Sequence, residues 1–153
     1  MELSSAQDVG RLGKTYRMPR DVAEGSDEAK RAWAIGVFMG VVDGDPFELK
    51  CVAVSEVDKV YEKLEIHERS PQMYVALNGS VAIPAAASLD ACDVTFYELR
   101  EGEAVVLDAR VWHGGPTGID VPATVLVVLK KGTTELDTKK SNLSPPVSLG
   151  RWC

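Results

Sequence analysis

Residues 73–85 read Met-Tyr-Val-Ala-Leu-Asn-Gly-Ser-Val-Ala-Ile-Pro-Ala, two short apolar runs separated by Asn78-Gly79. Asn and Gly both tolerate the positive φ of a two-residue type I′ turn, and such a turn matches the twist of paired strands. The stretch therefore predicts a β-hairpin whose strands are Met73–Leu77 and Val81–Ala85.

Runs of the same kind continue on both sides of this hairpin. They are rich in Val, Ile, Phe and Tyr, and clusters of Gly, Pro, Asn and Asp separate them. The further runs are Trp33–Val42, Phe47–Val54, Val60–Glu68, Val94–Leu99, Ala104–Leu107 and Ala123–Lys130. Short strands at regular spacing with turn residues between them are typical of a sandwich or barrel. We therefore predict an all-β fold, a jelly roll of two packed sheets whose mouth can hold a ligand.

The length of 153 residues fits a single domain with a real core. We expect residues 1–31, which mix Gly, Pro and many charges, to form an irregular N-terminal arm with a short helix over Ser26–Arg31. Residues 32–132 would form the barrel. Residues 133–153 would form a polar tail that lies along the surface or against a partner subunit.

Composition narrows the function classes. The net charge is −6 and no dense Lys/Arg block occurs, which argues against nucleic acid or an anionic membrane as a partner. The longest apolar stretches, 32–42 and 121–129, fall short of the roughly 20 residues of a spanning helix, and the first residues do not resemble a signal peptide. The three cysteines lack close spacing, so we expect reduced thiols in a cytoplasmic protein, with Cys51 as a small core residue.

The chain has two histidines, His67 and His113, and both lie beside turns in strand-rich sequence. Glu65 and His67 are two residues apart, so they share one face of a strand. The Ser70-Pro71 pair must break that strand, because proline cannot donate to a ladder, and Gln72 can then begin the next strand on the same side. The sequence predicts one site that contains Glu65, His67, Gln72 and His113.

Two imidazole-bearing motifs, the first followed by a predicted hairpin, resemble the paired motifs of the cupin superfamily. The resemblance implies a cupin-type double-stranded β-helix and a divalent metal ion held by Glu65, His67, Gln72 and His113. It also implies a homodimer, because cupins commonly pair through edge strands or an exchanged arm.

Within the cupins, the chain resembles the ureidoglycolate lyase family. The resemblance covers Tyr61 to Gly132 and departs from the family at Arg110 and Gly114, where the family has Gly and a second His. It implies an enzyme of purine and allantoin catabolism that releases urea and glyoxylate from ureidoglycolate. The residues that carry it are Glu65-Ile66-His67, Gln72, Met73–Leu77 with Asn78-Gly79, Trp112-His113, and the apolar run that ends at Lys130-Lys131-Gly132.

The donor set allows more than one chemistry. Imidazole, carboxylate and amide ligands suit a borderline divalent ion such as zinc, manganese, nickel or iron. Such an ion would act as a Lewis acid on a small hydroxyacid or ureido-acid. Without a metal, His113 or Glu65 would act as the base and the other partner as the acid, which makes Glu65, His67 and His113 the candidate catalytic residues.

A carboxylate product or substrate needs a cation. Arg69, Arg110 and Lys130 are the candidates, since guanidinium offers a bidentate fit, and Gln72 and Trp112 would line the mouth. Two alternatives to the lyase stay open. One is a metal-dependent cupin that acts on a sugar acid or keto-acid, and the other is a non-catalytic cupin that binds a small molecule.

Overall fold

The computed structural model describes residues 3–17 and 46–150. The helix predicted over Ser26–Arg31 and the strand predicted over Trp33–Val42 lie outside these residues. The strands are β1 (Ser4–Ser5), β2 (Gly13–Arg17), β3 (Phe47–Val54), β4 (Tyr61–His67), β5 (Gln72–Ala86), β6 (Thr95–Leu99), β7 (Glu103–Leu107), β8 (Trp112–His113), β9 (Thr117–Lys130) and β10 (Thr138–Val147). The helical turns are η1 (Ala6–Asp8), η2 (Gly10–Leu12), η3 (Ala91–Asp93) and α2 (Thr133–Leu136). No helix in the described ranges has the length and apolar character needed to cross a membrane.

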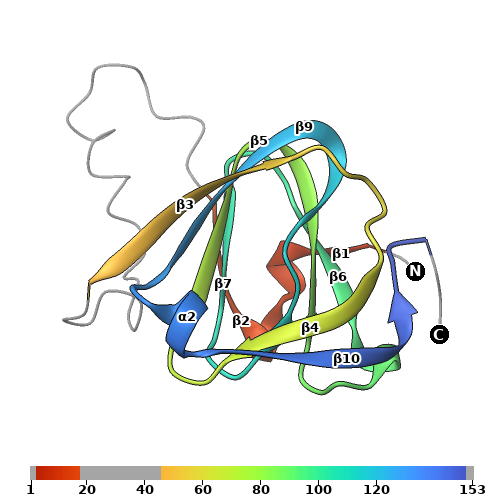
Figure 1. Cartoon of the computed structure of the whole chain (residues 1–153). Helices are drawn as coiled ribbons and strands as arrows, with labels where there is room; N and C mark the ends of the chain where they lie inside the picture. Colours follow the sequence, from red (N-terminus) through yellow and green to blue (C-terminus); the bar gives the residue numbers. More distant parts are fainter. Residues whose placement is uncertain (1–2, 18–45, 151–153) are drawn as a thin grey trace.

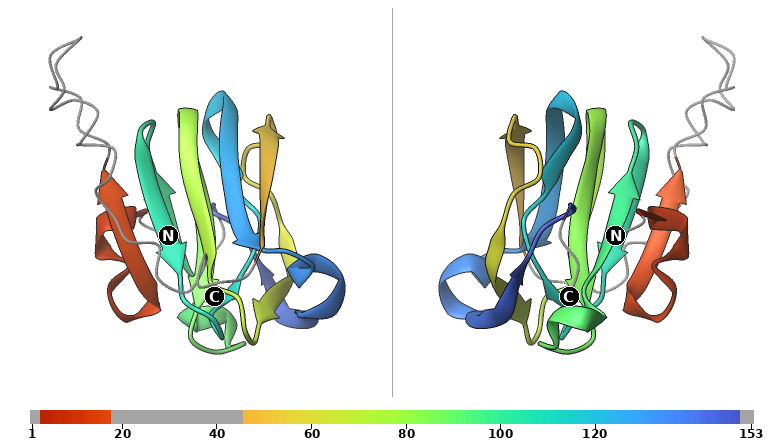
Figure 2. Two further views of the ribbon diagram at one scale, coloured as in Figure 1. Left: turned by 90° about the vertical axis from the view of Figure 1, so that its left-hand side faces the viewer. Right: turned by 90° about the vertical axis from the view of Figure 1, so that its right-hand side faces the viewer.

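The long strand β5 belongs to two layers. Its first half pairs with β7 and β9, which continue outward to β2 and β3 respectively. Its second half pairs with β6, β8 and the start of β9, and β4 and β10 follow beyond β8. The two layers face each other across the core, and the strands described here do not close into a ring (Figure 1, Figure 2). The predicted all-β fold of two packed layers is confirmed.

The predicted hairpin at Asn78-Gly79 is wrong, because β5 runs through both residues without turning back. Gly79 has a φ of +63°, and the pairing of β5 with β9 shifts register between Ala76 and Val81. A Cβ at Gly79 would lie 2.5 Å from the carbonyl oxygen of Asp120. Bulges and type I′ turns both use positive φ. The turn residues therefore form a bulge that bends β5 from one layer into the other.

The described segments near the two ends, residues 3–17 and 133–150, are more regular than predicted. β1 pairs with β6 and β2 with β7, so residues 4–17 are not an irregular arm. In the expected tail, β10 pairs antiparallel with β4, which places Thr138 opposite His67 and Lys140 opposite Glu65. The Ser144-Pro145-Pro146 sequence is compatible with this strand, because proline is tolerated in edge strands.

The core fills the space between the two layers. Its main cluster includes Tyr74, Val125, Val127 and Leu129 from the long strands β5 and β9. Strand β3 alternates between exposed residues and residues that face inward. Cys51 falls on the exposed side of β3, so its prediction as a core residue is wrong.

Candidate metal centre

Three side chains from two neighbouring strands meet at the inner face of the fold. Glu65 and His67 lie on β4, and His113 on β8 is paired in register with Glu65. One ligand atom from each residue lies within 4.8 Å of the others, and the two imidazole rings are 4.9 Å apart at their centroids. Both histidines are buried, whereas Glu65 is partly exposed. The alternation of β4 explains the grouping, since Glu65 and His67 share one face.

The ring of His113 is held in one tautomer. Its Nδ1 lies 2.9 Å from the carbonyl oxygen of Val111, which can only accept, so Nδ1 carries the proton. Nε2 then presents a lone pair toward Glu65, whose Oε1 is 3.7 Å away. Among the described residues this buried Nε2 has no hydrogen-bond partner. Burial lowers the pKa of His113 from 6.5 to about 4, and nearby His67 acts in the same direction, so the ring is neutral at pH 7.

His67 is oriented in the same way. Its Nδ1 lies 3.2 Å from the Thr138 hydroxyl, which donates its single proton to the carbonyl oxygen of Thr133. The Nδ1 atom of His67 must therefore donate to Thr138. In the neutral ring, Nε2 is then unprotonated and carries a lone pair, as in His113.

Gln72 completes the donor set beside His67. Its amide nitrogen donates to Tyr74 Oη at 2.6 Å, so its Oε1 faces His67 Nε2 at 2.8 Å. With His67 neutral, two acceptors face each other, and a bound cation or a second ring proton would relieve the contact.

The residues present fit a divalent metal ion. Two imidazole nitrogens, a carboxylate oxygen and an amide oxygen converge, which is a donor set suited to zinc, manganese, nickel or iron. Each ring donates its other N–H to a carbonyl or hydroxyl oxygen, as ligating histidines almost always do. The fit rests on this convergence of lone pairs and on the unpartnered Nε2 of His113.

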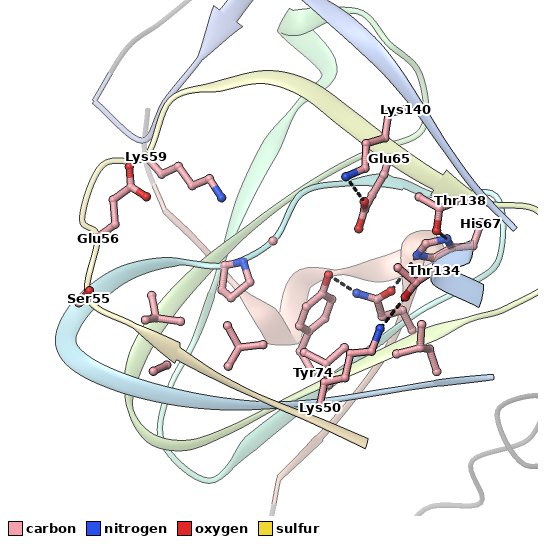
Figure 3. Close-up of a pocket in the computed structure, with 18 residues that line it drawn as sticks. Lys50, Ser55, Glu56, Lys59, Glu65, His67, Tyr74, Thr134, Thr138 and Lys140 are labelled. Atoms are coloured by element: carbon pink, nitrogen blue, oxygen red, sulfur yellow. Dashed lines mark hydrogen bonds and ion pairs between the residues drawn. The ribbon is translucent and has the colours of Figure 1, made fainter. Parts of the chain in front are cut away.

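The donor group borders a cavity of about 510 Å³, the main cavity (Figure 3). Glu65, His67 and Gln72 line it, whereas His113 lines a neighbouring cavity of about 490 Å³ that Glu65 also borders. The apolar part of the main cavity comes mostly from β3, β5 and β9, with Pro116 added just before β9. The strand residues are Val52, Ala53, Val54, Tyr74, Val127 and Leu129. A small polar molecule could thus meet the donor atoms in a partly dry environment.

The side chains predicted to bind a carboxylate lie elsewhere. Arg69 and Arg110 are both 76% exposed and pair with Asp137 and Glu68 respectively. Arg110 has a φ of +69° in the turn before β8, and its N–H donates to the carbonyl oxygen of His67. The turn thus supports the site through its backbone while the side chain of Arg110 points to solvent.

Two further predicted residues are also outside the main cavity. Lys130 lines a separate cavity together with Arg69. Trp112 is partly buried and packs against the cluster that contains Tyr61 and Phe96. The alternation of β8 explains this position, because Trp112 and its neighbour His113 face opposite sides.

Lys50, Lys59 and Lys140 line the main cavity instead, and sequence reasoning did not single them out. For Lys50 a signal was present, since it alternates in step with Val52 on β3. Lys140 and Thr138 could not be recognised, because they belong to a segment that was expected to be a tail.

The fold and the site define the class: an all-β jelly-roll domain with a candidate divalent-metal centre. No protein-family model matches the chain, and no curated protein matches it. Among solved structures, the sugar 3,4-ketoisomerase QdtA from Thermoanaerobacterium thermosaccharolyticum, in complex with TDP, is 18% identical, with a TM-score of 0.49 and coverage of 60% of this chain and 64% of that chain. A 3,4-ketoisomerase from Helicobacter canadensis is 14% identical, with a TM-score of 0.49 and coverage of 60% and 66%. Oxalate decarboxylase from Bacillus subtilis is 14% identical, with a TM-score of 0.47 and coverage of 62% and 24%.

The matched region therefore spans less than two thirds of each of these chains. At such identities and TM-scores the likeness supports no statement about activity or ligands.

Proposed function

We propose that this chain is a metal-dependent cupin-type enzyme that acts on a small hydroxy-, keto- or sugar acid. The observation that carries the proposal is the buried Nε2 of His113, which faces Glu65 and His67 with no hydrogen-bond partner in the described part of the chain. An unsatisfied buried polar atom costs about 1–3 kcal/mol. A cation bound at this point would remove that cost.

The residues of the chain orient the donors before anything binds. The Val111 carbonyl and the Thr138 hydroxyl hold the two rings through their Nδ1–H groups, and Tyr74 holds the amide of Gln72. A bound divalent ion would supply Lewis acidity for a carbonyl or hydroxyl oxygen of the substrate. The apolar residues of the main cavity limit the water around that oxygen.

Metal analysis of protein purified without a nickel column tests the metal site. We expect about one equivalent of a first-row divalent ion in the wild type and a loss of it in His113→Ala and Glu65→Gln. Glu62→Gln is the matched control, since Glu62 is an exposed carboxylate on the same strand. Wild-type protein that contains no stoichiometric metal, and takes up none when it is offered, would refute the proposal.

A narrower assignment is ureidoglycolate lyase. It is supported by the sequence resemblance over Tyr61 to Gly132 and by the position of His113 next to Glu65, a pair that could move the carbinol proton. Urea release from ureidoglycolate is the assay. Activity no higher than that of a His113→Ala control would end this assignment.

Two further proposals concern a purely ligand-binding role and the oligomeric state. Binding of a small acid without turnover would identify a non-catalytic cupin. A homodimer is expected from the resemblance, and light scattering on the purified chain tests it. A cytoplasmic location is expected from the widely spaced cysteines.

A further inference from the structure

The main cavity carries a local charge opposite to that of the chain. Lys50, Lys59 and Lys140 line it against Glu56 and Glu65, so three positive charges face two negative ones and leave one positive charge. The chain as a whole carries −6. A divalent ion at the candidate metal centre would raise the local charge to three. Such a cavity favours an anionic ligand.

Two of these three lysines already have partners. Lys50 Nζ donates to Thr134 Oγ1 at 2.5 Å and lies 3.3 Å from Glu48 Oε2. Lys140 Nζ lies 3.6 Å from Glu65 Oε2. Their charges are therefore largely offset by neighbours.

Lys59 differs from the other two lysines. Within residues 3–17 and 46–150, its ammonium group has no ion pair and no hydrogen bond, and it lies over the Tyr61 ring at 5.3 Å from the centroid. Figure 3 shows its side chain extending toward the cavity from the side away from His67. This ammonium is the cavity charge that a ligand can use without breaking an existing pair.

The backbone of Lys59 and the ring beneath its ammonium are both held in place. Its backbone N–H donates to Thr117 Oγ1 at 3.0 Å. The Tyr61 ring beneath its ammonium is buried, and the Tyr61 hydroxyl donates to the carbonyl oxygen of Gly115 at 2.6 Å. A preorganised cation loses less freedom when it binds a ligand, and that raises affinity.

We propose that Lys59 binds the carboxylate of the small acid in the main cavity and so selects anionic ligands over neutral ones of the same size. The inference rests on the proposed function, because the hydroxyl or keto oxygen at the other end of the ligand would meet the metal centre. Lys59 is thus a specificity-determining residue that none of the sequence motifs contains.

Calorimetric titration of the zinc-loaded protein tests the inference, with glyoxylate as the anionic probe and glycolaldehyde as the neutral one. We expect the wild type to prefer glyoxylate, Lys59→Ala to lose about tenfold in glyoxylate affinity with little change for glycolaldehyde, and Lys59→Arg to recover most of the loss. Lys139→Ala is the matched control, since Lys139 is exposed, pairs with Glu68 and lies outside the main cavity.

Metal content and thermal unfolding are measured for every variant, so that failure of the Lys59 proposal and failure of the proposed function can be distinguished. Lys59→Ala that folds, keeps its zinc and still prefers glyoxylate as strongly as the wild type would overturn the role of Lys59 alone. Failure of the wild type to hold zinc would overturn the proposed function. The same titrations on chelated protein would then decide whether Lys59 still selects the anion.

Discussion

Protonation of His113 should destabilise the metal-free protein in mild acid. The folded-state pKa of this ring is about 4, against 6.5 for an unperturbed histidine, and the ring is 2% exposed. The unfolded chain binds a proton below pH 6.5 that the folded chain does not accept. The stability that the neutral ring contributes is therefore complete above pH 6.5 and is lost as the pH falls to about 4.

The size of the effect follows from the same two values. A downward shift from 6.5 to about 4 corresponds to about 3 kcal/mol when fully expressed. Between about pH 7 and about pH 4.5, about 2 kcal/mol of this should disappear from the free energy of unfolding. Neighbouring carboxylates also titrate in this range, so the wild type alone does not isolate the contribution of His113.

Urea denaturation of chelated wild type and His113→Asn at both pH values isolates it. Effects of other groups are common to both proteins and cancel in the difference between the two pH-dependent losses. We expect the wild type to lose about 2 kcal/mol more than His113→Asn over this interval. Equal losses in the two proteins would show that His113 is not held neutral by burial, and the account of its unpartnered Nε2 would fall with it.

Three further outcomes are expected. Zinc at about one hundred times its Kd should stabilise the wild type by about 2.7 kcal/mol and His113→Ala by much less, and thermal melts with and without zinc would show whether it does. Thr138→Val should weaken zinc binding about 10- to 100-fold by competition titration, because it removes the hydroxyl that orients His67; unchanged affinity would contradict that role. Gly79→Ala should lower the free energy of unfolding by about 2 kcal/mol or more in urea denaturation, since the φ of Gly79 is +63° and the added Cβ would meet the Asp120 carbonyl. Gly115→Ala is the control and should lower it far less, because a Cβ there meets nothing within 4 Å.

The alternation of side chains along a strand explains why the sequence could group Glu65 with His67. Glu65 and His67 share a strand face whatever that strand pairs with, so their proximity depends on period alone. His113 joined them because it is the other histidine of the chain and lies at a strand–turn junction. The β4–β8 register that brings His113 opposite Glu65 is a long-range pairing that no local pattern specifies.

The wrong hairpin prediction has the same origin. Asn78-Gly79 has turn chemistry, yet the close approach of β9 at Asp120 makes it a bulge within one continuous strand. The choice between a turn and a bulge depends on a partner strand roughly forty residues further along, and intrinsic β preferences are weak beside such contacts. Arg69 and Arg110 were candidates because guanidinium suits carboxylates, but exposure depends on where each turn directs its side chain.

Strand β10 shows why the candidate centre is more than its two predicted motifs. It supplies Thr138, which fixes the tautomer of His67, and Lys140, which lies 3.6 Å from the carboxylate of Glu65. Both contacts follow from one antiparallel register in which Thr138 faces His67 and Lys140 faces Glu65. A slip of one residue would turn both side chains to the opposite face, because side chains alternate along a strand. The polar segment after the last apolar run therefore orients one candidate ligand and sets the charge beside another.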